Sequence, residues 1–125
     1  MSNIPSKEEI IGTDENQVTY RITAFTGIKS INLCGKVIKM IGPSVSEFFQ
    51  DSDDNITNAV RVFSQSLGNE ELAPIIKEML AGVSIDGRPL NLDYDFIGPK
   101  FAHLPKLLVA VAMFNWGDMF REISI

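Results

Sequence analysis

Cysteine, histidine and positive charge are all scarce in this 125-residue sequence, and each shortage excludes a class of function. A single cysteine, Cys34, can form neither an internal disulfide nor a Cys-rich zinc site, which fits a reducing cytosol. The formal net charge is −5, and the eleven Lys and Arg residues are scattered along the chain. Because no net positive field attracts a phosphate backbone, we expect no nucleic-acid partner.

Long apolar runs are also missing. The longest, LLVAVAMF at residues 107–114, is far shorter than the ~20 residues that a membrane-spanning helix needs. The first residues, MSNIPSKEEIIG, carry Glu8 and Glu9 where the apolar core of a signal peptide would lie. We therefore expect no export and no membrane partner, and the length suits one domain with one core.

The N-terminal half contains one strand pattern and one helix pattern. Residues 1–16 are polar and without periodicity, so we predict a flexible N-terminal arm there and a single domain over residues 17–125. Apolar and polar residues alternate through residues 18–24, which predicts a strand with one buried face. Thr26 then precedes an apolar stripe at helical spacing that a Gly-Pro pair ends. The stripe consists of Ile28, Ile31, Cys34, Val37, Ile38 and Ile41.

Further helices are predicted at residues 56–67, 72–80 and 104–114, each with apolar residues at helical spacing. A short helical turn is expected in PSVSEFFQ, residues 43–50, and the last helix is expected to stop near Asn115. The sequence thus predicts a mainly α fold. We expect a small single domain of four to five helices with a minor N-terminal strand or β-hairpin element.

The stretch VSIDGRPLNL, residues 83–92, is interpreted as a structural corner. Asp86-Gly87 permits the positive backbone dihedrals of a tight turn, and Pro89 restricts the following segment to extended geometry. We expect a small hairpin that pairs with the strand over residues 18–24, which otherwise lacks a partner. Arg88 is assigned no role beyond solubility or a local salt bridge.

Residues that could carry chemistry are few, and no motif frames them. His103 is the only histidine, and a lone histidine at a helix start is far more often a capping or surface residue than a base. DSDDNI, residues 51–56, begins like a calcium loop, but Ile56 and Val62 replace the glycine and glutamate that the loop needs. We therefore expect no enzymatic activity, no catalytic residue, no metal site and no cofactor.

Five segments together resemble a known family: VTYRITAF, KVIKMIGP, AVRVF, EMLAGVSIDGRPLNLDYDF and FNWGDMF. They are similar to the tail assembly chaperones of long-tailed bacteriophages. In that family a short strand precedes several helices, a G-V-x-x-D-G-x-P-L corner links two of them, and an N-aromatic-G-D segment ends the last. The likeness spans about residues 18 to 121, and none of these motifs carries chemistry.

The resemblance implies a non-enzymatic tail assembly chaperone of the host bacterial cytoplasm. Such a protein binds the tape measure protein before tail tube subunits polymerise around it, and it is not expected in the mature virion. Many members are made in two lengths by ribosomal frameshifting, and the longer form recruits the tail tube protein. A chain that stops at Ile125 would correspond to the short form. Whether copies associate into a homo-oligomer along a long client is left open.

Five aromatic or methionine side chains outside the best helical stripes are candidates for binding a partner. They are Phe48, Phe49, Trp116, Met119 and Phe120. For each one singly, folding back onto the core is the more common role, so the prediction rests on the group. Replacing Trp116 and Phe120 by alanine should weaken client binding while the helical circular dichroism signal persists.

Two other interpretations stay open. The same composition suits a structural minor tail or connector component of the phage particle, which purified virions would contain. A small enzyme would instead have to use His103 or the acidic cluster from Asp51 to Asp54. Full biological activity after substitution of His103 and Asp53 by alanine would leave that interpretation without support.

Overall fold

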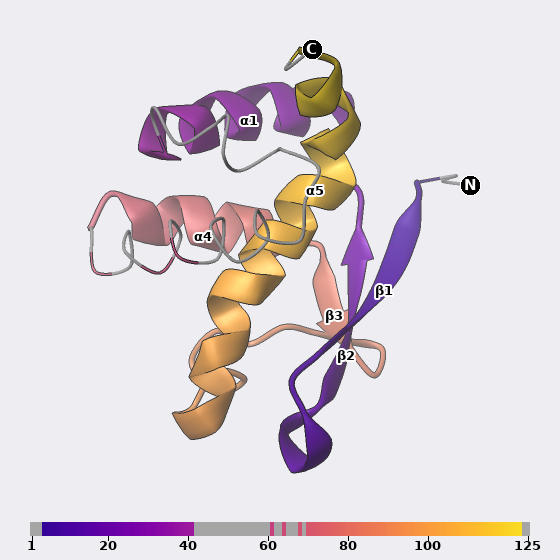
Figure 1. The fold of residues 1–125 in the computed structure, drawn as a ribbon, viewed down its shortest axis with the longest axis vertical. Coiled ribbons are helices and arrows are strands. Elements are labelled where there is room, and N and C mark those ends of the chain that lie inside the picture. Colours follow the sequence, from indigo (N-terminus) through magenta and orange to yellow (C-terminus); the bar gives the residue numbers. More distant parts are fainter. Residues whose placement is uncertain (1–3, 42–60, 62–63, 65–67, 69, 124–125) are drawn as a thin grey trace.

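The computed structural model describes residues 4–41, 61, 64, 68 and 70–123 (Figure 1). Four strands, three α-helices and two short 3-10 helices are formed by these residues. In chain order they are β1 (Ser6–Ile11), η1 (Asp14–Asn16), β2 (Val18–Thr23), α1 (Gly27–Ile41), α4 (Leu72–Leu80), β3 (Val83–Ile85), β4 (Arg88–Pro89), η3 (Gly98–Ala102) and α5 (His103–Ile123).

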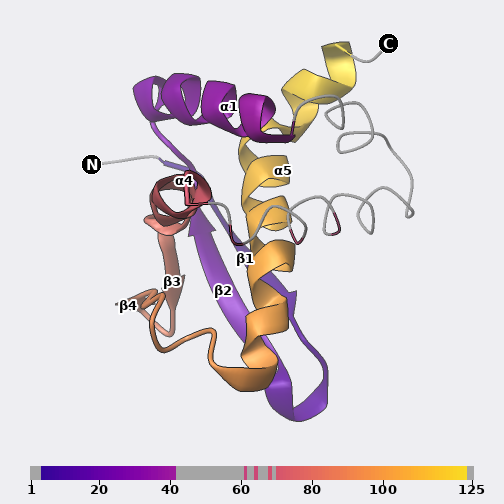
Figure 2. The ribbon, with the colours of Figure 1, turned by 90° about the vertical axis from the view of Figure 1, so that its left-hand side faces the viewer.

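The strands form one antiparallel sheet in the order β1-β2-β3-β4 (Figure 2). Successive side chains of β2 point to opposite faces, so Tyr20 and Ile22 are buried while Arg21 between them is exposed. The strand predicted over residues 18–24 is therefore confirmed as β2.

The N-terminal segment corrects the prediction of a flexible arm over residues 1–16. Residues 6–11 form β1, which pairs with β2 at six successive positions, and residues 14–16 form η1. This strand was not predicted because three consecutive charged residues, Lys-Glu-Glu, interrupt any alternation of apolar and polar residues. An edge strand can keep such side chains in solvent while its backbone is fully paired with one neighbour.

The corner at residues 83–92 is a hairpin, as predicted. Asp86 and Gly87 have φ values of 51° and 81°, so both central residues of the turn between β3 and β4 adopt left-handed conformations. The predicted pairing with the N-terminal strand is also confirmed, because Val83 lies opposite Ile22 of β2. The hairpin thereby extends the sheet beyond β2 and gives that strand a neighbour on each side.

Helix α5 lies along the inner face of the sheet (Figure 2), and most of the core lies between them. Leu107, Leu108 and Val111 of α5 are fully buried. The helix continues well past the stop predicted near Asn115. The Nδ2 group of Asn115 donates to the carbonyl of Val111, 2.9 Å away and one turn earlier, so this residue is accommodated within the helix.

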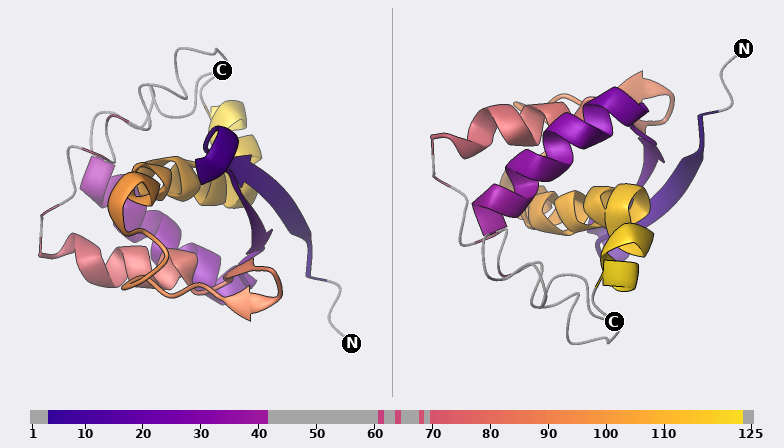
Figure 3. Two further views of the ribbon diagram at one scale, coloured as in Figure 1. Left: turned by 90° about the horizontal axis from the view of Figure 1, so that it is seen from below. Right: turned by 90° about the horizontal axis from the view of Figure 1, so that it is seen from above.

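Helices α1 and α4 pack against each other beside α5 (Figure 3). Helix α4 matches the helix predicted at residues 72–80. Helix α1 forms where predicted, and part of its predicted stripe is covered, because Val37 is 1% exposed and half-buried Cys34 and Ile38 pack against the core. The start of the stripe is not covered: Ile28 and Ile31 are 73% and 71% exposed, and Leu33, outside the stripe, is buried at 0%. The placement of the helix against α4 and the core, and not its apolar pattern alone, decides which side is covered.

The prediction of a mainly α fold with four to five helices is wrong. Three α-helices and a four-stranded antiparallel sheet among the described residues make the fold mixed α/β. The sheet was underestimated because β1 is charged and β3 and β4 are three and two residues long. The helix predicted at residues 56–67 and the turn at residues 43–50 fall almost wholly outside the described residues. None of the described helices has the length and hydropathy required to cross a bilayer.

Candidate binding groove

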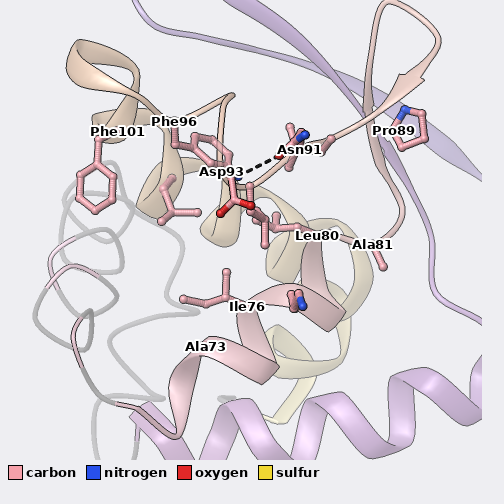
Figure 4. A pocket seen from close by; sticks show the side chains of 13 residues that line it. Ala73, Ile76, Leu80, Ala81, Pro89, Asn91, Asp93, Phe96 and Phe101 are labelled. Atoms are coloured by element: carbon pink, nitrogen blue, oxygen red, sulfur yellow. Dashed lines mark hydrogen bonds between the residues drawn. The ribbon is translucent and has the colours of Figure 1, made fainter.

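An open groove of about 870 Å³ lies between α4 and the segment that leads from β4 to α5 (Figure 4). Its volume falls within the ~300–1,000 Å³ range typical of ligand pockets. Most of its lining side chains are apolar. They are Ala73, Ile76, Leu80, Ala81, Pro89, Leu90, Leu92, Phe96, Phe101 and Leu104, with Lys77, Asn91 and Asp93 as the polar members.

The two walls of the groove come from different kinds of structure. Helix α4 supplies one wall, from which Ile76 points toward the opposite segment in Figure 4. Phe96 is buried at 7% exposure, whereas Phe101 on η3 is 51% exposed. Apolar side chains that are only partly covered leave favourable contacts for a further apolar group. The groove therefore suits apolar side chains of a partner rather than a charged substrate.

Polar contacts fix the wall opposite α4. Arg88 donates to both carboxylate oxygens of Asp95, at 3.0 and 2.7 Å, and the backbone N–H of Asn91 donates to the same carboxylate at 2.6 Å. The hydrogen bond from Arg88 is the main reason that the pKa of Asp95 is lowered. Asp93 N–H also donates to Asn91 Oδ1 at 3.0 Å, the dashed line in Figure 4. The predicted local salt bridge of Arg88 is thus present, and Asp95 connects it to Asn91, which lines the groove.

His103, the residue on which an enzyme interpretation depends, is buried in the core at 3% exposure. Its Nδ1 lies 2.8 Å from the hydroxyl of Tyr20 on β2. Burial lowers the pKa of His103, with further lowering by the charges of Lys106 and Lys100, and burial raises the pKa of Tyr20 to about 12. A hydrogen bond between a neutral imidazole and a neutral tyrosine joins β2 to the start of α5, which is a structural role.

Other chemical candidates find little support in the geometry. Across residues 4–41 and 70–123, no cluster of three or more His, Cys, Asp and Glu side chains could hold a metal ion. Cys34 is half-buried on α1, and burial raises the pKa of its thiol. The acidic cluster from Asp51 to Asp54 lies outside the described residues.

The five predicted partner-binding residues are not brought into the groove by any described contact. Trp116 is 4% exposed, and its ring centroid lies 5.8 Å from that of Phe25. Met119 and Phe120 lie within α5, but their side chains are outside the described part of the chain, as are Phe48 and Phe49 entirely. Partner binding by this group stays a prediction.

The same region has a clear structural function. Asn115 Oδ1 accepts a hydrogen bond of 2.9 Å from the backbone N–H of Phe25, which lies in the connection between β2 and α1. The indole Nε1 of Trp116 is buried and has no hydrogen-bond partner in the described structure. The Asn-Trp pair of the FNWGDMF segment therefore fastens α5 to the segment that leads into α1.

The groove itself was not predicted from the sequence. A usable signal was present: Leu90 and Leu92 alternate with polar residues, and Phe96 and Phe101 follow within the same connection. So many apolar residues in one connection between elements indicate that the connection packs against another part of the fold. Their convergence with α4 could only be seen once the chain was folded.

Comparison with protein-family models supplies the decisive observation, since a model described as phage tail assembly chaperone protein, TAC, matches residues 16–125. This chain belongs to the phage tail assembly chaperone family. The family resemblance carried by the sequence motifs is thereby confirmed, and chaperone membership itself suggests a non-enzymatic role. Comparison with curated proteins and with solved structures found no match. Strand β1 precedes the matched segment, so the tail assembly chaperone match covers the sheet from β2 onward together with the groove.

Proposed function

We propose that this tail assembly chaperone binds the tape measure protein and helps to recruit tail tube subunits during tail morphogenesis. It acts in the host bacterial cytoplasm by binding and release, and it leaves before the virion is complete. Family membership supports the role in tail assembly, and the groove between α4 and the segment from Pro89 to Phe101 is the observation that carries the proposed mode of binding.

The groove suits an amphipathic helix of the client. Helix-in-groove recognition needs an apolar trough that accepts side chains spaced three and four residues apart, and the lining of this groove is mainly apolar. Each Leu-sized side chain inserted there would gain about 1.5–3 kcal/mol from burial, offset by the cost of association. An open groove with a half-exposed aromatic wall favours reversible binding, which a chaperone that must leave its client requires.

Phe101 and Tyr94 form a matched pair that tests this proposal. Both are exposed aromatics of the connection between β4 and α5, at 51% and 71%, but only Phe101 lines the groove. We expect Phe101→Ala to weaken binding of the tape measure protein roughly tenfold, because a central aromatic contact is lost, and Tyr94→Ala to leave it unchanged. Affinity is measured by titration of an immobilised helical fragment of the tape measure protein.

Circular dichroism of both variants provides the control, because each replaced side chain is at least half exposed and the fold should persist. Equal binding by the wild-type chain and both variants would remove the groove from the proposal. The role in tail assembly would then rest on another surface.

A further inference from the structure

Helix α1 carries an apolar stripe that faces away from the core. Ile28 and Ile31 are the two most exposed isoleucines of the described structure, at 73% and 71%. Exposed Gly35 continues the same face, because positions separated by three and four residues lie along one side of a helix. Half-buried Ile38, one turn further on, packs against the core. A side chain built on Gly35 would meet no atom within 4 Å. We call Ile28, Ile31 and Gly35 the outer stripe of α1.

No described helix or strand covers the outer stripe. Seen from above in Figure 3, α1 crosses in front of α4. Its opposite side, with Leu33 and Val37, is the side packed into the core. The outer stripe is therefore a surface separate from the groove, which α4 and the connection from β4 to α5 form.

The charges of α1 are all of one sign. The helix contains Lys29, Lys36 and Lys39 and neither Asp nor Glu, although the whole chain has a net charge of −5. Lys39 is exposed, and Lys36 pairs with Glu78 at 3.6 Å, with the two side chains 51% and 45% exposed. An ion pair that open to solvent is weak, so a carboxylate of a partner can compete for Lys36.

We propose that the outer stripe of α1 binds an acidic amphipathic helix of a second protein. The isoleucines supply the apolar contact, Gly35 lets the partner's backbone approach closely, and Lys36 and Lys39 pair with carboxylates beside the partner's apolar face. This interaction does not depend on the groove, and it gives the molecule a second docking surface whose selectivity comes from charge.

Two other occupants fit the charges less well. A second copy that used the same face across a two-fold axis would bring six lysines together with no acidic residue of α1 to oppose them. An anionic membrane would attract the lysines, but it would repel a chain of net charge −5. The core side of α1 is already occupied by packing, so the helix offers little apolar area for insertion into lipid.

The experiment uses the full chain and two labelled peptides of about 18 residues, a length at which helices with strong propensity form. One peptide has a leucine stripe flanked by glutamates, and the other has lysine at each glutamate position. We expect the acidic peptide to bind and the basic peptide to bind at least roughly tenfold more weakly in fluorescence anisotropy. Raising the salt concentration from about 50 to about 300 mM should weaken the acidic complex.

Variants locate the binding site. The double substitution Ile28→Ser with Ile31→Ser should reduce affinity for the acidic peptide roughly tenfold, while Ile10→Ser, at a 61% exposed position on β1, should not change it. Lys36→Glu with Lys39→Glu should reverse the preference, so that the basic peptide binds more tightly. Both lysines are solvent-exposed, so the charge reversal should leave the fold intact. It therefore tests whether α1 binds the peptide even if the serine variant folds poorly.

Several outcomes would overturn the proposal. Equal affinity for both peptides, or an unchanged affinity after Ile28→Ser with Ile31→Ser, removes the outer stripe as the site. If Phe101→Ala alone abolished peptide binding, the acidic peptide would bind in the groove and not on the outer stripe. Sedimentation showing a dimer that the serine variant abolishes would identify a second copy as the occupant. Binding to phosphatidylglycerol vesicles that the same variant abolishes would identify a membrane surface.

Discussion

At the scale of single residues, the hydrogen bond between Tyr20 and His103 is a buried side-chain contact of the described structure. Both side chains are at most 3% exposed, and the 2.8 Å contact joins residues that are 83 positions apart. Gly12, with φ of 99°, lies directly against the imidazole, since a Cβ there would come within 2.6 Å of His103 Nε2. The ring is held on both sides and cannot turn toward solvent without moving the chain around Gly12.

Protonation of His103 should therefore oppose folding. The pKa of His103 is lowered in the folded chain, so at a pH below about 6.5 the unfolded chain binds more protons than the folded one. Stability contributed by neutral His103 is present above that pH and falls as the pH drops through it. Lys100 and Lys106 strengthen the effect, because their charges disfavour the imidazolium, and the hydroxyl of Tyr20 can only partly compensate.

We expect the urea midpoint of the wild-type chain to fall between about pH 7.5 and pH 5.5, where an ordinary histidine titrates. The variant His103→Gln, which carries no titrating group, should be less stable at pH 7.5 but should lose less on acidification. The lowered pKa of Asp95 acts at more acidic pH, so it contributes little in this range. Parallel changes in the two proteins would show that His103 is not the responsible group.

At the scale of elements, β1 is the part of the fold with the most direct test. Neighbouring isoleucines on this strand point to opposite faces, with Ile11 at 6% exposure in the core and Ile10 at 61%. We expect Ile11→Ala to lower the free energy of unfolding by about 2 kcal/mol or more, and Ile10→Ala by less than about 0.5 kcal/mol. Urea denaturation of both variants measures the difference.

A flexible arm would give the opposite result, because neither isoleucine would then pack against the core. Small and equal effects of the two substitutions would contradict the pairing of β1 with β2. Near-UV circular dichroism of Ile11→Ala, which reports the environment of Tyr20 and Trp116, shows whether the native fold remains for the comparison.

The sequence correctly predicted those elements whose conformation is decided by residues close together along the chain. Alternation predicted β2, and Asp86-Gly87 predicted the turn of the β3–β4 hairpin, because a left-handed pair of residues is a local requirement. The correct side of α1 could not be read in the same way. Its stripe contains isoleucines on two adjacent faces, and only the packing of Leu33 and Val37 decides between them.

The candidate site was harder to predict than the fold. The groove combines α4 with the connection from β4 to α5, and no sequence pattern states how far apart those segments come to lie. The partner-binding prediction instead selected residues by type, so it included Trp116, whose ring packs on Phe25 in the core. An aromatic residue outside a helical stripe can equally well fill the space where two elements meet.

At the scale of the whole molecule, the chain presents two unlike surfaces on one mixed α/β fold. The groove is mainly apolar, and its two charged lining residues, Lys77 and Asp93, are of opposite sign. The outer stripe of α1 carries exposed isoleucines, and the only charged residues of that helix are lysines. Membership of the tail assembly chaperone family fits interaction with tail proteins in general, and two surfaces of different chemistry would let one chain contact two kinds of segment at once.

The proposed function requires that this chain keep the tape measure protein soluble until the tail assembles. The most direct measurement is co-expression of the two proteins, with the fraction of soluble tape measure protein and its co-elution on size exclusion chromatography as the readouts. We predict that the tape measure protein is soluble and co-elutes only when the wild-type chain is present. A tape measure protein that stays insoluble, while this chain purifies alone and is found in assembled virions, would contradict the proposed function.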